Sequence, residues 1–165
     1  METPLKGEVE KMRESEERFG APYRFTTARR TLSETDIVNF VNLVGLYEPI
    51  FIDMEFAKNL TPHGRRFAPG PLIIAIGMGL VAPNITEILA AIISEEVVGI
   101  CGGMVGLKAR LKAPVFPGDT LRVDGEGTKR KTSEGYTLVD IKHVVKNQRD
   151  EVTVEFTETV IFLPA

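Results

Sequence analysis

Two kinds of hydrophobic periodicity divide the chain. Between residues 34 and 95, apolar residues recur every three or four positions, which is the spacing of helices that bury one face. From residue 97 onward, apolar and polar residues tend to alternate, as they do in strands with one face in the core. The alternation is clearest near the carboxyl end, where Val152, Val154 and Phe156 point one way and the residues between them the other. The pattern predicts helices followed by a sheet, an α+β fold.

The first half of the chain predicts one strand and four helices. Ser33 is suited to cap a helix with an acidic first turn, and Gly45 is suited to end that helix. Asp53 is placed to cap a short helix in the same way. The segment 72–81 is apolar on all sides, so we expect this helix to be wholly buried and to end before Pro83. The expected ranges are a strand at 25–32 and helices at 34–44, 54–59, 72–81 and 86–95.

The second half predicts four strands joined by turns that are rich in turn-forming residues. Because short turns favour antiparallel neighbours, we expect these strands to form a meander in chain order. Residues 1–22 are dominated by Glu, Lys and Arg and are expected to form a charged arm outside a single domain at 23–165. The expected strands span 97–111, 119–131, 136–147 and 151–163.

Composition narrows the classes of function. A net charge of −3 offers no basic surface for nucleic acid. No window approaches the run of about 20 apolar residues that spans a bilayer, and the charged amino terminus does not resemble a secretory signal, so we expect a cytoplasmic protein without membrane contact. Cys101 is the only cysteine and the two histidines lie far apart in the sequence, so we expect no disulfide, no metal site and no cofactor.

Two segments carry a family resemblance. Residues 45–53 read GLYEPIFID, and residues 111–121 read LKAPVFPGDTL. The first is similar to G-D-x-N-P-[IL]-H-x-D and the second to F-x-x-P-V-x-P-G-D-x-L, which are signatures of the MaoC-like (R)-specific enoyl-CoA hydratases and dehydratases. The resemblance covers most of residues 26–163. It implies a hotdog fold, in which an antiparallel sheet wraps around a long buried helix.

The resemblance also indicates which chemistry is missing. The family adds water reversibly to a trans-2-enoyl thioester, and its catalytic aspartate and histidine fall on Leu46 and Phe51. Neither side chain can transfer a proton, so we expect a dry pocket without the standard mechanism and leave catalytic activity open. The family also uses a backbone N–H at the start of the buried helix to polarise the thioester carbonyl. Gly70 holds the matching position, and Pro71 removes the next N–H.

Other residues offer replacement acids, bases and ligands. Glu48 stands where the family has asparagine, and His63 lies in the loop before the buried helix, so both are candidate catalytic residues, with a solvated loop position as the alternative. His143 lies in a predicted strand and is expected at the surface. Arginine side chains could bind the phosphates of coenzyme A in bidentate fashion. The candidate substrate-binding residues are Tyr47, Arg65, Arg66 and Gly70.

The family resemblance, together with the absence of the catalytic aspartate and histidine, predicts a protein that binds an acyl thioester of coenzyme A or of acyl carrier protein. One alternative is a non-catalytic subunit that pairs with a dyad-bearing hotdog protein in a larger dehydratase. Another is a hydratase or thioesterase that uses Glu48 or His63. We also expect a homodimer, because a lone hotdog sheet leaves an exposed strand edge that invites pairing.

Overall fold

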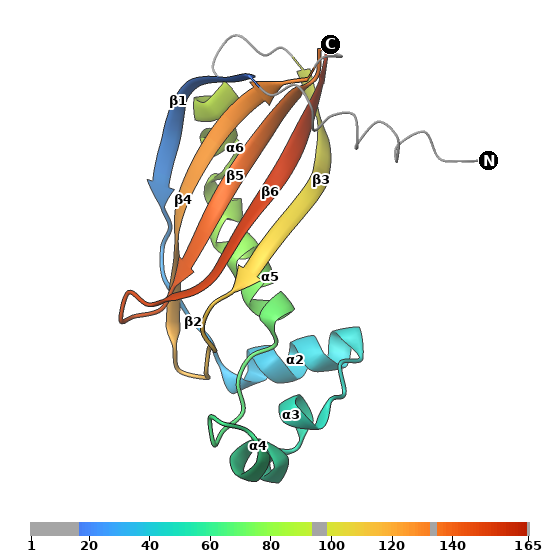
Figure 1. Ribbon diagram of the computed structural model, residues 1–165, viewed down its shortest axis with the longest axis vertical. Helices are drawn as coiled ribbons and strands as arrows, with labels where there is room; N and C mark the ends of the chain where they lie inside the picture. Colours follow the sequence, from blue (N-terminus) through green and yellow to red (C-terminus); the bar gives the residue numbers. More distant parts are fainter. Residues whose placement is uncertain (1–16, 94–98, 133–134, 165) are drawn as a thin grey trace, which may run out of the picture.

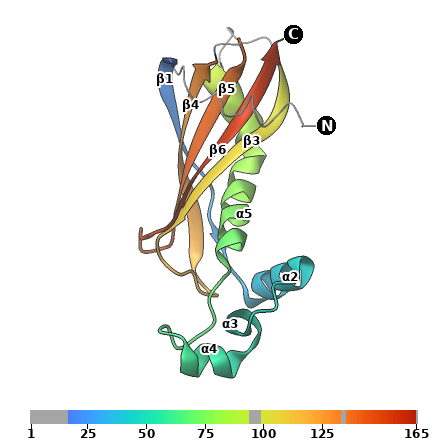
Figure 2. The same ribbon diagram turned by 45° about the vertical axis from the view of Figure 1, so that its right-hand side comes forward.

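The computed structural model describes residues 17–93, 99–132 and 135–164 of the chain. A twisted antiparallel sheet carries a long helical segment along one face, here called the inner face, and three short helices gather at one end of that segment (Figures 1 and 2). This arrangement is the predicted α+β hotdog. The strands are β1 (Glu17–Thr26), β2 (Arg30–Thr31), β3 (Gly99–Leu111), β4 (Thr120–Lys131), β5 (Thr137–Lys146) and β6 (Val152–Pro164). The helices are α2 (Glu34–Val44), α3 (Pro49–Ile52), α4 (Met54–Leu60), α5 (Gly70–Val81), the 3-10 turn η1 (Ala82–Asn84) and α6 (Ile85–Ile93).

The strand order in the sheet is β1-β4-β5-β6-β3, with β2 paired to β4. All pairs are antiparallel, as predicted. The meander is correct for β4, β5 and β6 but wrong for β3, which pairs with β6 from Gly99↔Pro164 to Leu111↔Val154. The connection from β3 to β4 contains two prolines and crosses the sheet end, so it is not a hairpin turn. This crossing leaves β3 at the sheet edge.

Residues 17–22 correct the predicted boundary of the charged arm. They belong to β1, which pairs with β4 from Glu17↔Lys131 to Thr26↔Asp124. The predicted strand at 25–32 is therefore shifted, with only β2 left in its second half. Edge strands of natural sheets often carry charged residues, so the charge that suggested a solvated arm is compatible with an edge strand. The rest of the predicted arm, residues 1–16, lies outside the described residues.

Helix boundaries follow the predicted caps. The Oγ of Ser33 accepts a hydrogen bond from the Asp36 backbone N–H, and Asp36 Oδ2 accepts one from the Ser33 backbone N–H at 2.8 Å. Helix α2 then ends at Gly45, which adopts a left-handed conformation with φ of 70°. Asp53 Oδ1 accepts two backbone N–H bonds from the first turn of α4, at 2.9 and 3.0 Å.

The central helix α5 lies along the inner face of the sheet but is not wholly buried, contrary to prediction. Gly77 is buried, and a Cβ placed on it would meet Phe156 Cε1 at 2.9 Å, so the helix and sheet approach closely there. Ala75 and Gly79 are exposed on the opposite side. The fully buried side chains of α5 are those of Leu72, Ile73, Ile76 and Val81.

The continuous helical segment Gly70–Ile93 corrects a second expectation. Its 24 residues are long and apolar enough to cross a membrane by length and composition, although no such window was expected from the sequence. Buried core helices pass the same test, and this segment packs on β4, β5 and β6. Only 33% of its most apolar window is buried, so much apolar helix surface remains uncovered in the single chain.

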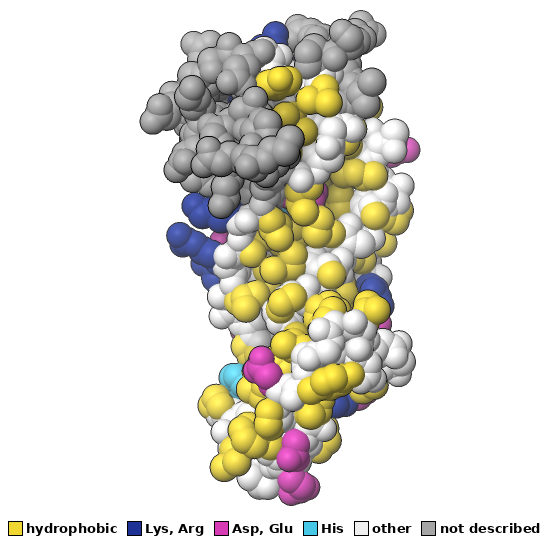
Figure 3. All heavy atoms as spheres, turned by 90° about the vertical axis from the view of Figure 1, so that its right-hand side faces the viewer, with side chains coloured by type: hydrophobic (Ala, Val, Ile, Leu, Met, Phe, Trp, Pro, Cys, Tyr) yellow, Lys and Arg dark blue, Asp and Glu magenta, His cyan; other side chains and the backbone are white. Residues whose placement is uncertain are grey.

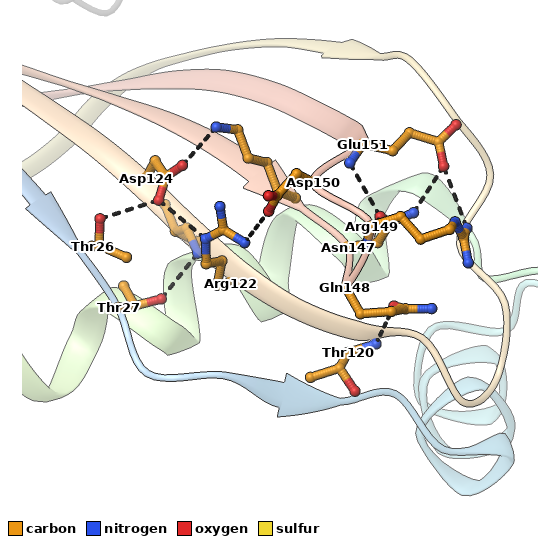
Figure 4. Close-up of polar contacts among 12 residues, drawn as sticks. Thr26, Thr27, Thr120, Arg122, Asp124, Asn147, Gln148, Arg149, Asp150 and Glu151 are labelled. Carbon is orange, nitrogen blue, oxygen red and sulfur yellow. Dashed lines mark hydrogen bonds and ion pairs between the residues drawn. The ribbon is translucent and has the colours of Figure 1, made fainter.

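A polar network on the outer face joins β4 to the β5–β6 turn (Figure 4). Arg122 donates to Asp124 at 3.3 Å and to Asp150 at 2.5 Å, and Lys146 donates to Asp124 at 2.7 Å. Asp150 has a positive φ of 63°, which an aspartate tolerates in a tight turn. The network fixes the end of the sheet that lies nearest the short helices.

Candidate functional site

The residues shared with the family signature shape the loop between α2 and α4. Gly45 ends α2, Pro49 is the first residue of α3, and Asp53 caps α4. Leu46 and Phe51 are half-buried, and the Phe51 ring meets the Phe67 ring edge-on at 5.8 Å. The residues shared with the signature therefore form turns and helix caps. The two positions of the family dyad are held by the apolar side chains of Leu46 and Phe51.

The amino terminus of α5 borders a cavity of about 250 Å³. Gly70 lines this cavity, and Pro71 has no N–H. The next two amides of the helix, at Leu72 and Ile73, both bond to the Pro69 carbonyl, so Gly70 supplies the remaining amide of the first turn. The positive end of the helix dipole adds to this donor. The other residues around the cavity are His63, Phe67, Ala68, Ile73, Leu111, Lys112, Ala113, Pro114, Val115 and Val154.

The P-V-x-P-G-D segment holds this helix start in place. Asp119 is buried, and its Oδ2 accepts a hydrogen bond from the Phe116 backbone N–H at 2.9 Å. Its Oδ1 accepts one from Gln148 Nε2 at 2.8 Å. The Val115 carbonyl in the same turn accepts from the Ala68 backbone N–H at 2.8 Å, two residues before α5 begins. The second signature thus positions the cavity wall and the Gly70 donor together.

A side chain at Gly70 would collide with the cavity wall. A Cβ built there lies 2.5 Å from Leu111 Cδ1, so the absence of a side chain is what lets Leu111 cover the start of α5. Leu111 itself is 62% exposed. It therefore packs on the Cα of Gly70 and keeps most of its own side chain open to solvent.

Of the candidate residues outside the helix, only His63 lines this cavity, and Arg65 lies just outside its lining. The His63 ring meets Phe67 and Phe116 edge-on at 5.4 and 5.7 Å, and His63 lines the cavity. The Arg65 guanidinium lies 3.7 Å from the centre of the Phe116 ring. An exposed cation is thus held by stacking beside the cavity.

The remaining candidates are placed differently. Glu48 and Tyr47 are exposed in the loop before α3 and do not line the cavity in the single chain. Arg66 points inward, where it donates to the Phe51 carbonyl at 3.2 Å and pairs with Glu34. Its Nε is buried without a hydrogen-bond partner among the described residues. Arg66 ties the signature loop to α2, and this contact occupies the guanidinium that was expected to reach phosphate.

His143 corrects the expectation of a surface histidine. It is fully buried on the inner face of β5, stacked on Phe156 with ring centres 4.2 Å apart, and its Nε2 lies 3.1 Å from Glu158 Oε1. Sequence reasoning missed this pair, although alternation with the buried residues Ile141 and Val145 would have placed His143 inside. No cluster of three or more metal-binding side chains occurs within 17–93, 99–132 and 135–164.

Comparison with known proteins gives a consistent result. A family model described as the FAS1-like dehydratase domain region matches residues 20–156. A monoamine oxidase regulatory protein from Archaeoglobus fulgidus is 31% identical, with a TM-score of 0.72 over 89% of this chain and 92% of that one. No curated protein sequence matches.

Two further solved structures share the fold. An (R)-hydratase from Pseudomonas aeruginosa is 25% identical, with a TM-score of 0.58 over 88% of this chain and 81% of that one. A (3R)-hydroxyacyl-ACP dehydratase complex from Mycobacterium tuberculosis, HadBC, is 17% identical, with a TM-score of 0.66 over 86% and 95%. At 17% identity the likeness to the second shows the fold alone.

Proposed function

Because this chain belongs to the FAS1-like dehydratase family and has the MaoC-like hotdog fold, we propose that it binds an acyl thioester of coenzyme A or acyl carrier protein. The observation that carries the proposal is the cavity of about 250 Å³ at the amino terminus of α5, with Gly70 in its lining. A single amide at a helix start is suited to hold a thioester carbonyl oxygen. The apolar lining is suited to the acyl chain beyond it.

The phosphates of coenzyme A would lie at the rim of this cavity. Arg65 is exposed outside the cavity lining and held over Phe116, whose ring contacts His63, so its guanidinium can face an incoming phosphate without first being ordered. Tyr47 is 60% exposed at the same end of the molecule and offers an aromatic surface to the ligand. Arg66 acts from behind the site, because its contacts with Glu34 and Phe51 hold the signature loop.

We further propose that the standard hydration step does not occur. Leu46 and Phe51 occupy the positions of the family dyad and cannot exchange protons. The expected result is that purified protein hydrates crotonyl-CoA no faster than background. If turnover is seen, the proposal that hydration does not occur would be wrong. Loss of that turnover in Glu48→Gln or in His63→Ala would then identify the residue that replaces the dyad.

Binding is tested separately from turnover. Isothermal calorimetry with acyl-CoAs of several chain lengths should show saturable binding, and the same ligands should raise the melting temperature by mass action. Gly70→Ala is the matched variant and should weaken binding, because its methyl group must displace Leu111 from the cavity lining. The double change Leu46→Asp with Phe51→His is expected to create measurable hydration if only the dyad is missing.

A second candidate is supported by the uncovered surface of α5. The chain could serve as a non-catalytic subunit beside a dyad-bearing hotdog protein, as HadBC is a complex of this fold. This role needs no ligand in the Gly70 cavity. Failure of every acyl-CoA to bind at millimolar concentration would reject the thioester proposal and favour the subunit role.

A further inference from the structure

Glu158 is an acidic residue on the inner face of β6, where its neighbours Phe156 and Val160 are buried and apolar. The residue is only 7% exposed. Its Oε1 lies 3.1 Å from His143 Nε2, and this is the one hydrogen bond of the Glu158 side chain among the described residues. The second carboxylate oxygen therefore has no protein donor in the part of the chain that the structure describes. A carboxylate in such apolar surroundings is costly unless a donor completes its hydrogen bonds.

This carboxylate borders a hollow of about 300 Å³ at the carboxyl end of α5. Glu158 is the only ionisable side chain in the lining, and the rest is apolar. The hollow offers an acceptor and apolar walls but no side-chain donor, so it suits an apolar group that carries a hydrogen-bond donor. The other lining residues are Met78, Gly79, Val81, Ala82 and Ile85.

Two independent measures give the separation of this hollow from the Gly70 cavity. Along α5, Gly70 and Met78 are eight residues apart, which is about 12 Å at 1.5 Å per residue. Along β6, Val154 in the first cavity and Glu158 in the second are four residues apart, which is about 13 Å at 3.3 Å per residue. The two hollows thus lie at opposite ends of one stretch of helix and strand.

The surface between them is apolar. On β3, Leu111 pairs with Val154 and Leu107 pairs with Glu158, so both leucines belong to the same face of the sheet as the two hollows. Leu107 is 49% exposed and Leu111 is 62% exposed. Figure 3 shows apolar side chains running along this side of the molecule between its two ends. We call this surface, bounded by α5, β6 and β3, the α5–β3 strip.

We propose that the α5–β3 strip holds the acyl chain of the thioester, and that Glu158 selects a chain bearing a hydroxyl group at its far end. An extended alkyl chain advances roughly 1.25 Å per carbon–carbon bond, given bonds of about 1.5 Å and angles near 111°, so about ten bonds cover the 12 to 13 Å. The hydroxyl group would therefore stand roughly nine to eleven carbons from the thioester carbonyl. This inference rests on the proposed thioester binding at Gly70.

The same geometry disfavours a plain alkyl chain of that length. Its terminal methyl group would cover the free oxygen of Glu158 and exclude water without providing a donor, which leaves a buried acceptor unpaired. A chain of about eight carbons stops short of Glu158 and avoids this penalty. The effect of the terminal group on the dissociation constant should therefore depend on the length of the acyl chain.

The test measures dissociation constants by calorimetry for octanoyl-, decanoyl- and 10-hydroxydecanoyl-CoA. The full-length protein is expected to bind the hydroxylated ligand roughly ten- to a hundredfold more tightly than decanoyl-CoA, the range for one hydrogen bond to a charged group. In Glu158→Leu this preference should disappear and decanoyl-CoA should bind more tightly than before. Octanoyl-CoA should be affected least.

Two further variants keep the result interpretable. Glu126→Leu removes a glutamate from the outer face of β4, where it pairs with Arg24 and lines neither hollow, and should leave all three constants unchanged. If Glu158→Leu fails to fold, the double change His143→Phe with Glu158→Leu removes both partners of the buried pair and should show the same loss of preference.

The outcomes separate the two proposals. If none of the three ligands binds, thioester binding itself is wrong, and the inference fails with it. If all bind but decanoyl- and 10-hydroxydecanoyl-CoA do so equally, or if the preference survives in Glu158→Leu, thioester binding stands and the role of Glu158 is rejected.

Discussion

The carboxylate of Asp36, at the start of α2, makes the stability of the folded protein depend on pH. Its pKa is held below the ordinary aspartate value, chiefly by the hydrogen bond from the Ser33 backbone N–H, with smaller contributions from the Ser33 hydroxyl and the Arg30 guanidinium. A group whose pKa is lowered by folding stabilises the folded state at pH values above its unfolded pKa, near 3.9. That contribution is lost as pH falls through the lower folded pKa.

Asp36→Asn is therefore expected to destabilise the protein at pH 7 by up to about 1 kcal/mol, the size of a helix cap. The difference from the unmodified protein should shrink as pH falls from about 4 through the lower folded pKa of Asp36, because the carboxylate then becomes protonated. Urea unfolding at pH 7 and pH 3 measures it. Glu87→Gln, in the first turn of α6, is the control and should leave the stability nearly unchanged at both pH values. A penalty for Asp36→Asn that is equal at both pH values would refute the electrostatic part of the argument.

Single residues were predictable where their role is local. Ser33, Gly45 and Asp53 cap helices as expected, because capping depends on a few neighbouring residues. The burial of His143 and the inward position of Arg66 were not predicted, since each depends on a partner distant in the sequence. The candidate site divides in the same way: Gly70 and His63 line one cavity, whereas Glu48 stands apart from it in the single chain.

Helix α5 contains one glycine that packs against the sheet and another that is exposed. Gly77 and Gly79 are two residues apart, yet a Cβ on Gly77 would meet Phe156 at 2.9 Å and Val145 at 3.1 Å, while a Cβ on Gly79 meets nothing within 4 Å. Helix propensity favours alanine over glycine at both positions by about 1 kcal/mol. Only at Gly77 does steric overlap oppose this gain.

Gly77→Ala is expected to destabilise the protein by about 1 to 3 kcal/mol, because the new methyl group overpacks a buried contact. Gly79→Ala, the matched control, should instead stabilise it by about 0.5 to 1 kcal/mol. Chemical denaturation of both variants measures the difference. Destabilisation by Gly79→Ala would contradict the exposure of this turn in the single chain.

The elements were predicted more successfully than their arrangement. Periodicity locates α2, α5, α6 and the last four strands to within a few residues, because it reports which side of each element meets the core. It does not say which strand pairs with which, and so β3 was placed beside β4 instead of β6. Strand β1 was shifted for a related reason, since an edge strand with charge lacks the apolar alternation that marks central strands.

At the scale of the whole molecule, the described residues leave a strand edge unpaired and an apolar helix surface uncovered on the same side. Strand β3 ends the sheet, and its other edge has no strand partner among the described residues. Beside it, only a third of the most apolar window of the α5–α6 segment is buried. Met104 and Val105 on β3 are each at least 41% exposed. The open edge of β3 is suited to pairing with a strand of a partner, whereas the apolar α5–β3 strip beside it is the surface that we assign to the acyl chain.

We expect this partner to be a second copy of the chain, paired edge to edge through β3. Sedimentation equilibrium at micromolar concentration should give twice the chain mass of 18.2 kDa. Met104→Lys places a charge on the edge strand and should shift the protein towards monomer, because pairing would bury that charge. Leu43→Lys, at a position 83% exposed on α2, adds the same charge away from β3 and should leave the dimer intact. A stable monomer in the unmodified protein would instead assign the open edge to a different hotdog subunit or leave it unpaired.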